Sequence, residues 1–459
     1  MKKDTEHMYL LRFLALGLAI IVIGFDITAF PVALPSITQE FYSSLNHAQW
    51  IFNGYALALG VFIITGGKLA DLYGRRKTFF IAMFFFVLFL LLGAFSTSMN
   101  MLIICRILMG LCTAVVLPAI IGMIFSLVPE SKAAIAGGFV IGMSGVGNAT
   151  GPVLGGVLTD ALGWRWILLV NIPIALFAML VVLKTIVKDA PKTTQEMDYW
   201  GVTLLSLSLF SLLFALELIA ELNTDHPLII GLFTLFVVLF FIFLKEEQMA
   251  KSKALISPDI LKNQTFIAIG GTSILISTIW FAVLLFLPHF FENEWHFTAG
   301  QSGVALLPFI ISYAIVSFTA GGLYESLGAK WTITLGASLL AVGMLQLSFI
   351  QISTPYWQLS IALIAMGVGV GVAYPSIVTA AVQSVSSEHM SLASGVMYLC
   401  RVAGGAIGVA MNTCVISLSN SLIEGMRLAF MINMLLALSG VLSCLLFIHV
   451  ENDVRDGKA

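Results

Sequence analysis

Charged residues inside long apolar stretches are the first feature of this sequence that points to chemistry. Asp26, Arg106 and Arg401 each lie within an apolar run long enough to cross a bilayer, and Glu217 lies one turn from the end of another. Burying a charge in hydrocarbon costs at least several kcal/mol unless the charge is paired or hydrated. We therefore expect these side chains to pair with one another or to border a polar path.

Asp26 and Arg106 are expected at similar depth, in the outer half of their spans, when each residue is counted as ~1.5 Å of helix. A low dielectric favours the neutral form of a carboxyl group, so Asp26 is a candidate proton carrier. A nearby Arg106 would favour the charged form and so adjust the proton affinity of Asp26. The alternative is a permanent ion pair that only holds two helices together.

A short loop between two apolar runs carries a second cluster of charge and reads G-K-L-A-D-L-Y-G-R-R-K. Gly67 and Gly74 permit close approach and a positive φ. Asp71 is suited to accept hydrogen bonds from the amides of a helix N-terminus. Arg75 is suited to pair with a carboxylate, and Glu130 is the candidate. The alternative is a loop whose cations only set membrane topology.

Small residues form a third pattern, in which glycines recur every four positions at Gly147, Gly151 and Gly155. This spacing makes one flat helix face that lets another helix approach closely. Pro152 adds a kink, and Gly156 extends the motif. The alternative is an ordinary packing seam of small residues.

These residues lie in a chain built almost entirely of apolar segments. Of its residues 59% are hydrophobic and 10% are charged, whereas a soluble protein has roughly 25% charged residues. Segments of spanning length occur at 10–31, 48–67, 78–97, 101–126, 134–159, 164–187, 199–219, 227–244, 264–288, 302–323, 332–350, 357–383, 391–417 and 428–450. The sequence therefore predicts an all-α polytopic membrane protein with 14 transmembrane helices.

The distribution of charge predicts the topology and the domains. If the N-terminus is cytoplasmic, 18 of the 22 Lys and Arg residues fall on the inner side, two fall on the outer side and two lie within spans, so both termini are expected inside. The first apolar run lacks a cleavage site and is read as a retained helix. Polar linkers isolate a two-helix hairpin, with six spans on either side of it. The expected domains are 1–187, the linkers and inserted hairpin at 188–262, and 263–459.

The two halves show weak similarity to each other, as transporter halves do. At an offset of 257 positions, Gly110 matches Gly367 and Pro118 matches Pro375. The charged loop has a degraded counterpart at Gly322–Lys330. We interpret this as an internal repeat of a six-helix unit.

Other classes of function find no support in the sequence. It contains no protease, hydrolase or phosphate-binding motif, and no soluble stretch is long enough for a nucleotide-binding domain. The five cysteines lie in apolar runs at no metal-like spacing, so no metal site is expected. With a net charge of −2 and no basic run, no nucleic-acid partner is expected. The chain is predicted not to be an enzyme.

Several motifs resemble those of the major facilitator superfamily. The charged loop is similar to the loop between the second and third helices of that family, and the stretch around Arg106 resembles its second motif. The pattern G-x-x-x-G-P-x-x-G-G at 147–156 resembles the motif typical of its antiporters. The segments around Asp26 and at Leu399–Gly408 resemble features of its fourteen-helix drug:proton antiporters. The resemblance covers essentially the whole chain and implies two six-helix bundles around a central cavity, with alternating access.

The implied function is proton-coupled antiport that exports amphiphilic drugs or other small organic compounds across the cytoplasmic membrane. The proton gradient would drive a monomer that needs no cofactor. Asp71 would meet the start of the span 391–417 when the cytoplasmic side is shut. The alternatives are an exporter of one specific metabolite or lipid, and a receptor or scaffold of the same fold that moves no solute.

Candidates for the substrate pocket come from position alone, and ordinary packing or anchoring at the lipid interface is an equal alternative for them. They are Tyr55, Glu217, Trp280, Tyr398, Arg401 and Asn412.

Overall fold

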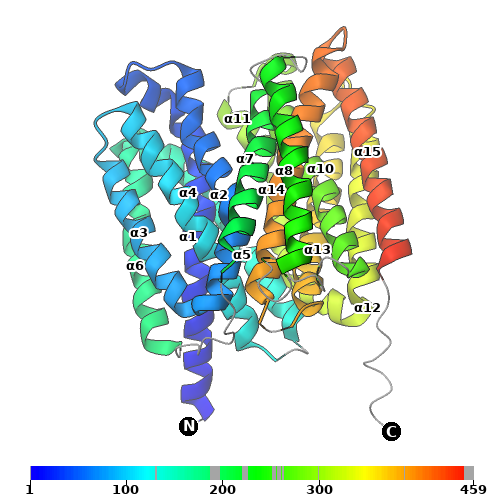
Figure 1. Cartoon of the computed structure of the whole chain (residues 1–459). Helices are drawn as coiled ribbons and strands as arrows, with labels where there is room; N and C mark the ends of the chain where they lie inside the picture. Colours follow the sequence, from blue (N-terminus) through cyan, green and yellow to red (C-terminus); the bar gives the residue numbers. More distant parts are fainter. Residues whose placement is uncertain are drawn as a thin grey trace. The chain divides into compact units, whose positions relative to one another are not determined.

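The computed structural model describes residues 2–129, 132–186, 197–219, 226–250, 255, 260, 263–297, 299–386 and 388–448. These residues form helices joined by short connections, and no strand occurs among them (Figure 1). Within this part of the chain, 13 helices are long and apolar enough to cross a membrane. The predicted all-α, polytopic class is confirmed.

The helices before the hairpin are α1 (Lys2–Glu40), α2 (Leu45–Tyr73), α3 (Arg75–Ala94), α4 (Met99–Leu127), α5 (Ala133–Leu162) and α6 (Arg165–Thr185). The hairpin consists of α7 (Tyr199–Leu218) and α8 (Pro227–Ala250). The later helices are α10 (Gln264–Glu294), α11 (Ala299–Ala305), α12 (Leu307–Leu347), α13 (Tyr356–Gln383), α14 (Met390–Ser417) and α15 (Leu422–Phe447).

Local sequence explains where several helices begin. The side-chain oxygens of Ser44, Ser98, Asn263 and Ser421 each accept a hydrogen bond from the backbone N–H three residues further on. Such a cap satisfies one of the free amides in the first helical turn and contributes about 1 kcal/mol. These caps begin α2, α4, α10 and α15.

Helix α1 extends well beyond its predicted end at residue 31. Proline commonly ends or distorts a helix, but α1 continues through Pro31 and Pro35 to Glu40. Proline removes one backbone hydrogen bond, and neighbouring helices and polar side chains make this loss tolerable in a membrane helix. Asp26 therefore lies within a continuous helix.

Helix α12 covers most of two predicted spans, 302–323 and 332–350, which form the legs of a tight turn. Gly328 breaks the helical geometry with φ 77° and ψ 171°, which glycine tolerates because it has no Cβ. Both legs pack on neighbouring positions of α13, since Gly367 lies against Phe309 and Gly369 lies against Gly336. Both legs of α12 therefore contact α13, and all fourteen predicted spans have a helical counterpart.

The chain divides into two compact units, each formed from several segments. Unit 1 comprises Met1–Pro129, Met143–Pro258 and Val385–Val402, and unit 2 comprises Glu130–Gly142, Asp259–Ser384 and Ala403–Ala459. Helices α5 and α14 contribute residues to both units. The predicted division at residues 187 and 262 stays a prediction, because a domain boundary is defined by independent folding rather than by contacts alone.

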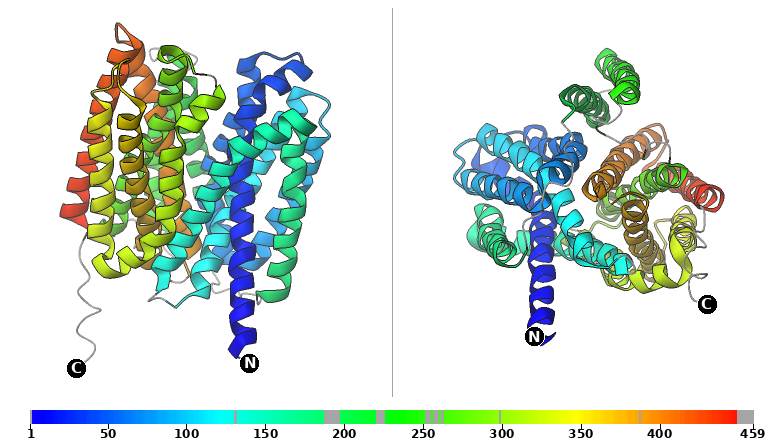
Figure 2. Two further views of the ribbon diagram at one scale, coloured as in Figure 1. Left: turned by 180° about the vertical axis from the view of Figure 1, so that it is seen from behind. Right: turned by 60° about the horizontal axis from the view of Figure 1, so that its bottom comes forward.

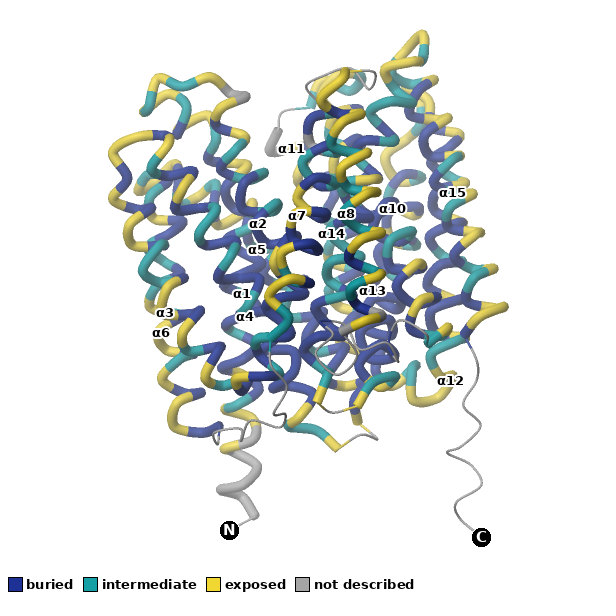
Figure 3. Tube along the Cα trace, viewed as in Figure 1, coloured by how far each residue is buried: buried dark blue, intermediate teal, exposed yellow. Residues whose placement is uncertain are grey.

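The inserted hairpin belongs to unit 1. Its helices α7 and α8 lie side by side as a green pair (Figure 2) and α7 packs along α2. Helix α8 is exposed over most of its length (Figure 3), whereas the middle of α1 is buried. The exposed face of α8 is apolar, as a lipid-facing helix requires.

Candidate functional site

The close packing of α4 on α2 positions Arg106. A Cβ placed on Gly110 would lie only 3.1 Å from the Tyr55 Cα, so glycine is needed for the two backbones to come this near. Arg106 lies one turn before Gly110, and its Nε donates to the Ile51 carbonyl of α2 at 3.2 Å. This contact directs the guanidinium towards the neighbouring helix α1.

Asp26 of α1 receives that guanidinium. Arg106 Nη1 donates to Asp26 Oδ2 at 2.5 Å, and both side chains have an exposed fraction of 0%. The other carboxylate oxygen, Oδ1, has no hydrogen-bond partner, and neither does Arg106 Nη2. Buried polar atoms are nearly always satisfied, so two orphaned atoms at one ion pair require an explanation.

Two aromatic rings lie against the guanidinium. Its central carbon lies 4.2 Å from the ring centroid of Phe30 and 4.4 Å from that of Tyr55. The Tyr55 hydroxyl shares a hydrogen bond of 2.7 Å with Thr113, which holds the ring in place. A desolvated cation between π faces gains about 2 kcal/mol. These two rings therefore stabilise the guanidinium in its buried position.

The glycine face of α5 packs on the part of α1 that carries Asp26. A Cβ on Gly147 would lie 2.7 Å from the Ile21 carbonyl oxygen, and one on Gly155 would lie 2.8 Å from the Ala29 Cβ. Between them, a Cβ on Gly151 would overlap the Thr28 hydroxyl. Gly156 has more room, and Pro152 is exposed. The motif thus gives α5 a close-fitting seat for α1 on both sides of Asp26.

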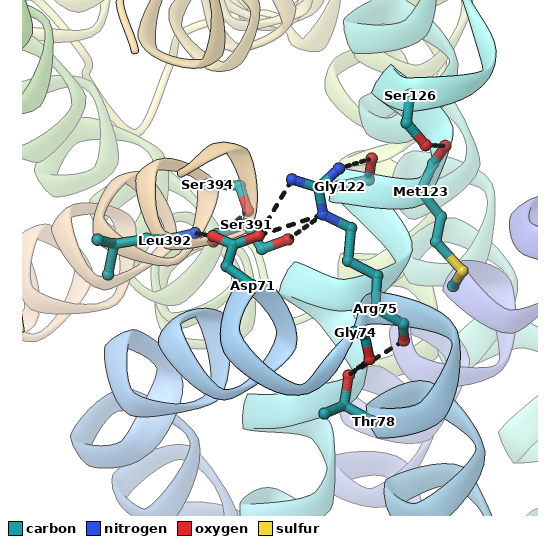
Figure 4. Close-up of polar contacts among 10 residues, drawn as sticks. All are labelled: Asp71, Gly74, Arg75, Thr78, Gly122, Met123, Ser126, Ser391, Leu392 and Ser394. Atoms are coloured by element: carbon teal, nitrogen blue, oxygen red, sulfur yellow. Dashed lines mark hydrogen bonds and ion pairs between the residues drawn. The ribbon is translucent and has the colours of Figure 1, made fainter. Parts of the chain in front are cut away.

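A second polar site lies where α2 ends, within unit 1. Asp71 Oδ2 accepts a hydrogen bond of 2.9 Å from the backbone N–H of Leu392, in the first turn of α14 (Figure 4). Gly67 permits this approach, because a Cβ there would lie 2.7 Å from the Ser391 carbonyl oxygen. The carboxylate meets the positive end of a helix dipole, an interaction of about 0.3–1 kcal/mol at an exposed site and up to about 2 when partly buried.

Arg75 completes this contact, which we call the latch: Asp71, Arg75, Ser391, Leu392 and the Gly122 carbonyl. The Arg75 Nε and Nη2 donate to Asp71 Oδ1 at 3.1 and 3.0 Å (Figure 4). The Arg75 Nε also lies 3.0 Å from Ser391 Oγ, and Arg75 Nη1 donates to the Gly122 carbonyl of α4 at 3.1 Å.

The orientation of Arg75 depends on the turn at the preceding residue, Gly74. Gly74 has φ 94°, which separates α2 from α3 and lets Arg75 point back towards α2. The proposed partner Glu130 lies outside the described residues. The role of this residue therefore stays a prediction.

The described pocket candidates are divided between the two units, three in unit 1 and two in unit 2. Tyr55 belongs to the cage around Arg106, and in unit 1 the Arg401 guanidinium lies 5.9 Å from the ring centroid of Tyr398. In unit 2, Trp280 is buried against aromatic rings, and the Asn412 side-chain oxygen accepts a hydrogen bond from the Asn433 amide at 2.7 Å.

The sixth candidate is Glu217, whose side chain lies outside the described part of the structure. The pocket assignment stays a prediction.

Several residues of these sites were not singled out from the sequence. Phe30 and Thr113 are ordinary membrane-helix residues, and only their positions around Arg106 give them a part. Gly122 and Ser391 belong to the latch through a carbonyl and a hydroxyl. Ser391, the first residue of the predicted span 391–417, is the one whose position gave a usable signal, because serine is common at helix N-termini.

This fold and these sites define a membrane transporter. A family model of the Major Facilitator Superfamily matches residues 16–246 and 269–459. The chain therefore belongs to the major facilitator superfamily and is a multi-pass membrane protein.

Its relatives include several resistance proteins. The multidrug resistance protein Stp of Mycobacterium tuberculosis (strain CDC 1551 / Oshkosh) is 30% identical over 88% of this chain and 75% of its own length. The tetracenomycin C resistance and export protein of Streptomyces glaucescens is 26% identical over 87% of this chain and 74% of its own. The methylenomycin A resistance protein of Bacillus subtilis is 26% identical over 94% and 92%.

A solved structure shows the same fold. It is that of the human organic anion transporter MFSD10 (TETRAN), with a TM-score of 0.72 over 96% of this chain and 99% of that chain. The two sequences are 13% identical, so this likeness concerns the fold alone.

Proposed function

We propose that this transporter is a proton-coupled antiporter that exports amphiphilic drugs or other small organic compounds. The observation that carries the proposal is the fully buried pair of Asp26 and Arg106, in which one carboxylate oxygen lacks a partner. Such a carboxylate can take up a proton at low cost, because the lost ion pair is offset by relief from burying a charge. The resistance functions in the names of its relatives support export as the direction.

The proton and the substrate are coupled through Asp26. Protonation neutralises the carboxylate and releases one donor of Arg106, which keeps its carbonyl and ring contacts. Export binds substrate and proton alternately, so each step changes the charge at this site. The ligand and the proton thereby shift the balance between inward-open and outward-open states.

The latch biases the same balance from the end of α2. We propose that its contacts form in the outward-open state and are broken in the inward-open state. The latch joins a carboxylate, a guanidinium and a helix end. Because these contacts form in one of the two states alone, they shift the equilibrium towards that state.

The cellular setting follows from the sequence and the family. The excess of Lys and Arg in alternate connections supports a position in the cytoplasmic membrane with both termini inside. The transporter works as a monomer, and the proton gradient supplies the energy without a cofactor or catalytic step.

Two measurements test this function. The gene in an efflux-deficient host should give resistance to several amphiphilic drugs, and acid-inside inverted vesicles should accumulate ethidium until an uncoupler is added. Accumulation that is indifferent to the uncoupler contradicts proton coupling. Resistance to a single compound would favour the second candidate, an exporter of one metabolite, which the single-antibiotic names of two relatives also suggest.

A further inference from the structure

A buried cation adjoins the latch. Lys68 follows Gly67 in α2 and lies one turn before Asp71, and it is only 2% exposed. An ammonium group removed from water needs opposite charge nearby. Asp71 supplies part of it, but both oxygens of Asp71 already accept hydrogen bonds from Arg75 and Leu392.

The inserted hairpin supplies the remaining negative charge. Three carboxylates act on the Lys68 ammonium: that of Glu247 in α8, that of Asp71, and that of Asp198, directly before α7. Glu247 is 1% exposed, and its Oε1 accepts a hydrogen bond of 3.0 Å from the Leu255 N–H.

The two hairpin carboxylates converge on the first turn of α7. Asp198 Oδ1 accepts a hydrogen bond from the Gly201 N–H at 2.9 Å. A Cβ on Gly201 would lie 3.3 Å from Glu247 Oε1 and would overlap the Asp198 carboxylate. Glycine at this position therefore leaves room for both charges at one end of the hairpin.

Apolar contacts hold the hairpin to α2 at the same time. A Cβ on Gly60 would lie 2.7 Å from Leu213 Cδ1 of α7, and the rings of Trp50 and Phe214 are 5.9 Å apart. Helix α7 is thus fixed along α2, so Asp198 and Glu247 keep their places beside Lys68.

We propose that the α7–α8 hairpin is a brace for the latch, in which Glu247 and Asp198 act as positioning residues through Lys68. The hairpin carboxylates pair with the Lys68 ammonium, so the Asp71 carboxylate keeps its hydrogen bonds to Arg75 and to the start of α14. Without Glu247, the ammonium turns to Asp71 and competes with the Leu392 N–H for its carboxylate. This role rests on the proposed alternating-access function, and it gives the inserted hairpin a task in that cycle.

Hydrogen exchange of the full-length purified protein, measured by mass spectrometry, tests the brace. The first amides of a helix have no intrahelical partner, so the Leu392 N–H is protected by Asp71. Glu247→Gln should raise the exchange rate at the start of α14 about tenfold, equal to about 1.4 kcal/mol. The control is Glu246→Gln, a half-exposed neighbour on the same helix, which should leave this rate unchanged.

A double-mutant cycle shows whether Glu247 acts through Lys68. Lys68→Met removes the competing ammonium. Adding Glu247→Gln to Lys68→Met should therefore cause no further increase in the exchange rate of the Leu392 N–H. An equal effect of Glu247→Gln in both backgrounds would overturn the proposal.

Three other results would also overturn the brace: no change in Glu247→Gln, the same change in Glu246→Gln, or faster exchange spread equally over α1 and α4. The last result would make Glu247 a general contributor to stability. Because exchange needs no substrate and no gradient, the brace is judged separately from the proposed transport activity. Failure of the protein in the ethidium assay would contradict the proposed transport activity and leave the brace unaffected.

Discussion

The Arg106 guanidinium donates to Asp26 over 2.5 Å while the second oxygen of that carboxylate has no partner. The guanidinium is held independently by the Ile51 carbonyl and two aromatic rings. In this ion pair the Arg106 side chain is held by other contacts, whereas the Asp26 side chain is not. Such a pair is suited to losing the negative charge of the carboxylate. This asymmetry fits the proposed proton carrier better than a static bridge between helices.

Asp26→Asn should abolish proton release on substrate binding while the protein remains folded. Asparagine mimics the protonated carboxyl group that the proposed cycle already visits. A static bridge predicts instead a loss of about 3–5 kcal/mol, because a buried cation would be left alone. Proton release measured on the purified variant, together with its thermal unfolding, distinguishes the two. Wild-type release would refute the assignment.

Arg106→Leu should move the pH optimum of any remaining transport upward. The guanidinium favours the charged form of Asp26, so without it the carboxyl group holds its proton to higher pH. Transport in vesicles across a pH series measures the displacement. An optimum at the wild-type pH would mean that the two residues do not communicate.

Asp71→Asn should weaken the latch and favour the inward-open state by about tenfold, since about 1.4 kcal/mol corresponds to that factor. Transport should fall while substrate still binds from the cytoplasmic side. Spin labels at Tyr73 and Glu388, in a background without the five cysteines, should report longer distances. The exposed carboxylate of Asp160 provides the control, as Asp160→Asn should leave the distances unchanged. Unchanged distances in Asp71→Asn would leave the loop with a role in topology only.

Gly151→Ala should destabilise the protein by about 1–3 kcal/mol, because the new methyl group overlaps the Thr28 hydroxyl and pushes α5 away from α1. Proton release should weaken with it, since Asp26 lies in that part of α1. Gly231→Ala is a matched control on α8, where a Cβ meets nothing within 4 Å. Thermal unfolding of both variants gives the comparison, and equal stability of the two would argue against a close-fitting seat.

Hydropathy and charge alone determined the helices of this protein and several of the residues worth testing. A chain in lipid must satisfy its backbone within each span, so long apolar runs predict helices even where a proline intervenes, as Pro118 does in α4. The cost of intramembrane charge singled out Asp26 and Arg106, and counting along the helices placed them at similar depth.

The tertiary structure decided which faces meet. Depth along a helix follows from counting residues, whereas rotation about its axis depends on packing against all of its neighbours. Gly110 against Tyr55 turns Arg106 towards Asp26, and Gly67 against Ser391 brings Asp71 to Leu392. The partners Phe30, Thr113 and Gly122 carry no charge or motif, so only long-range packing could assign them, because it joins residues that are far apart in the chain.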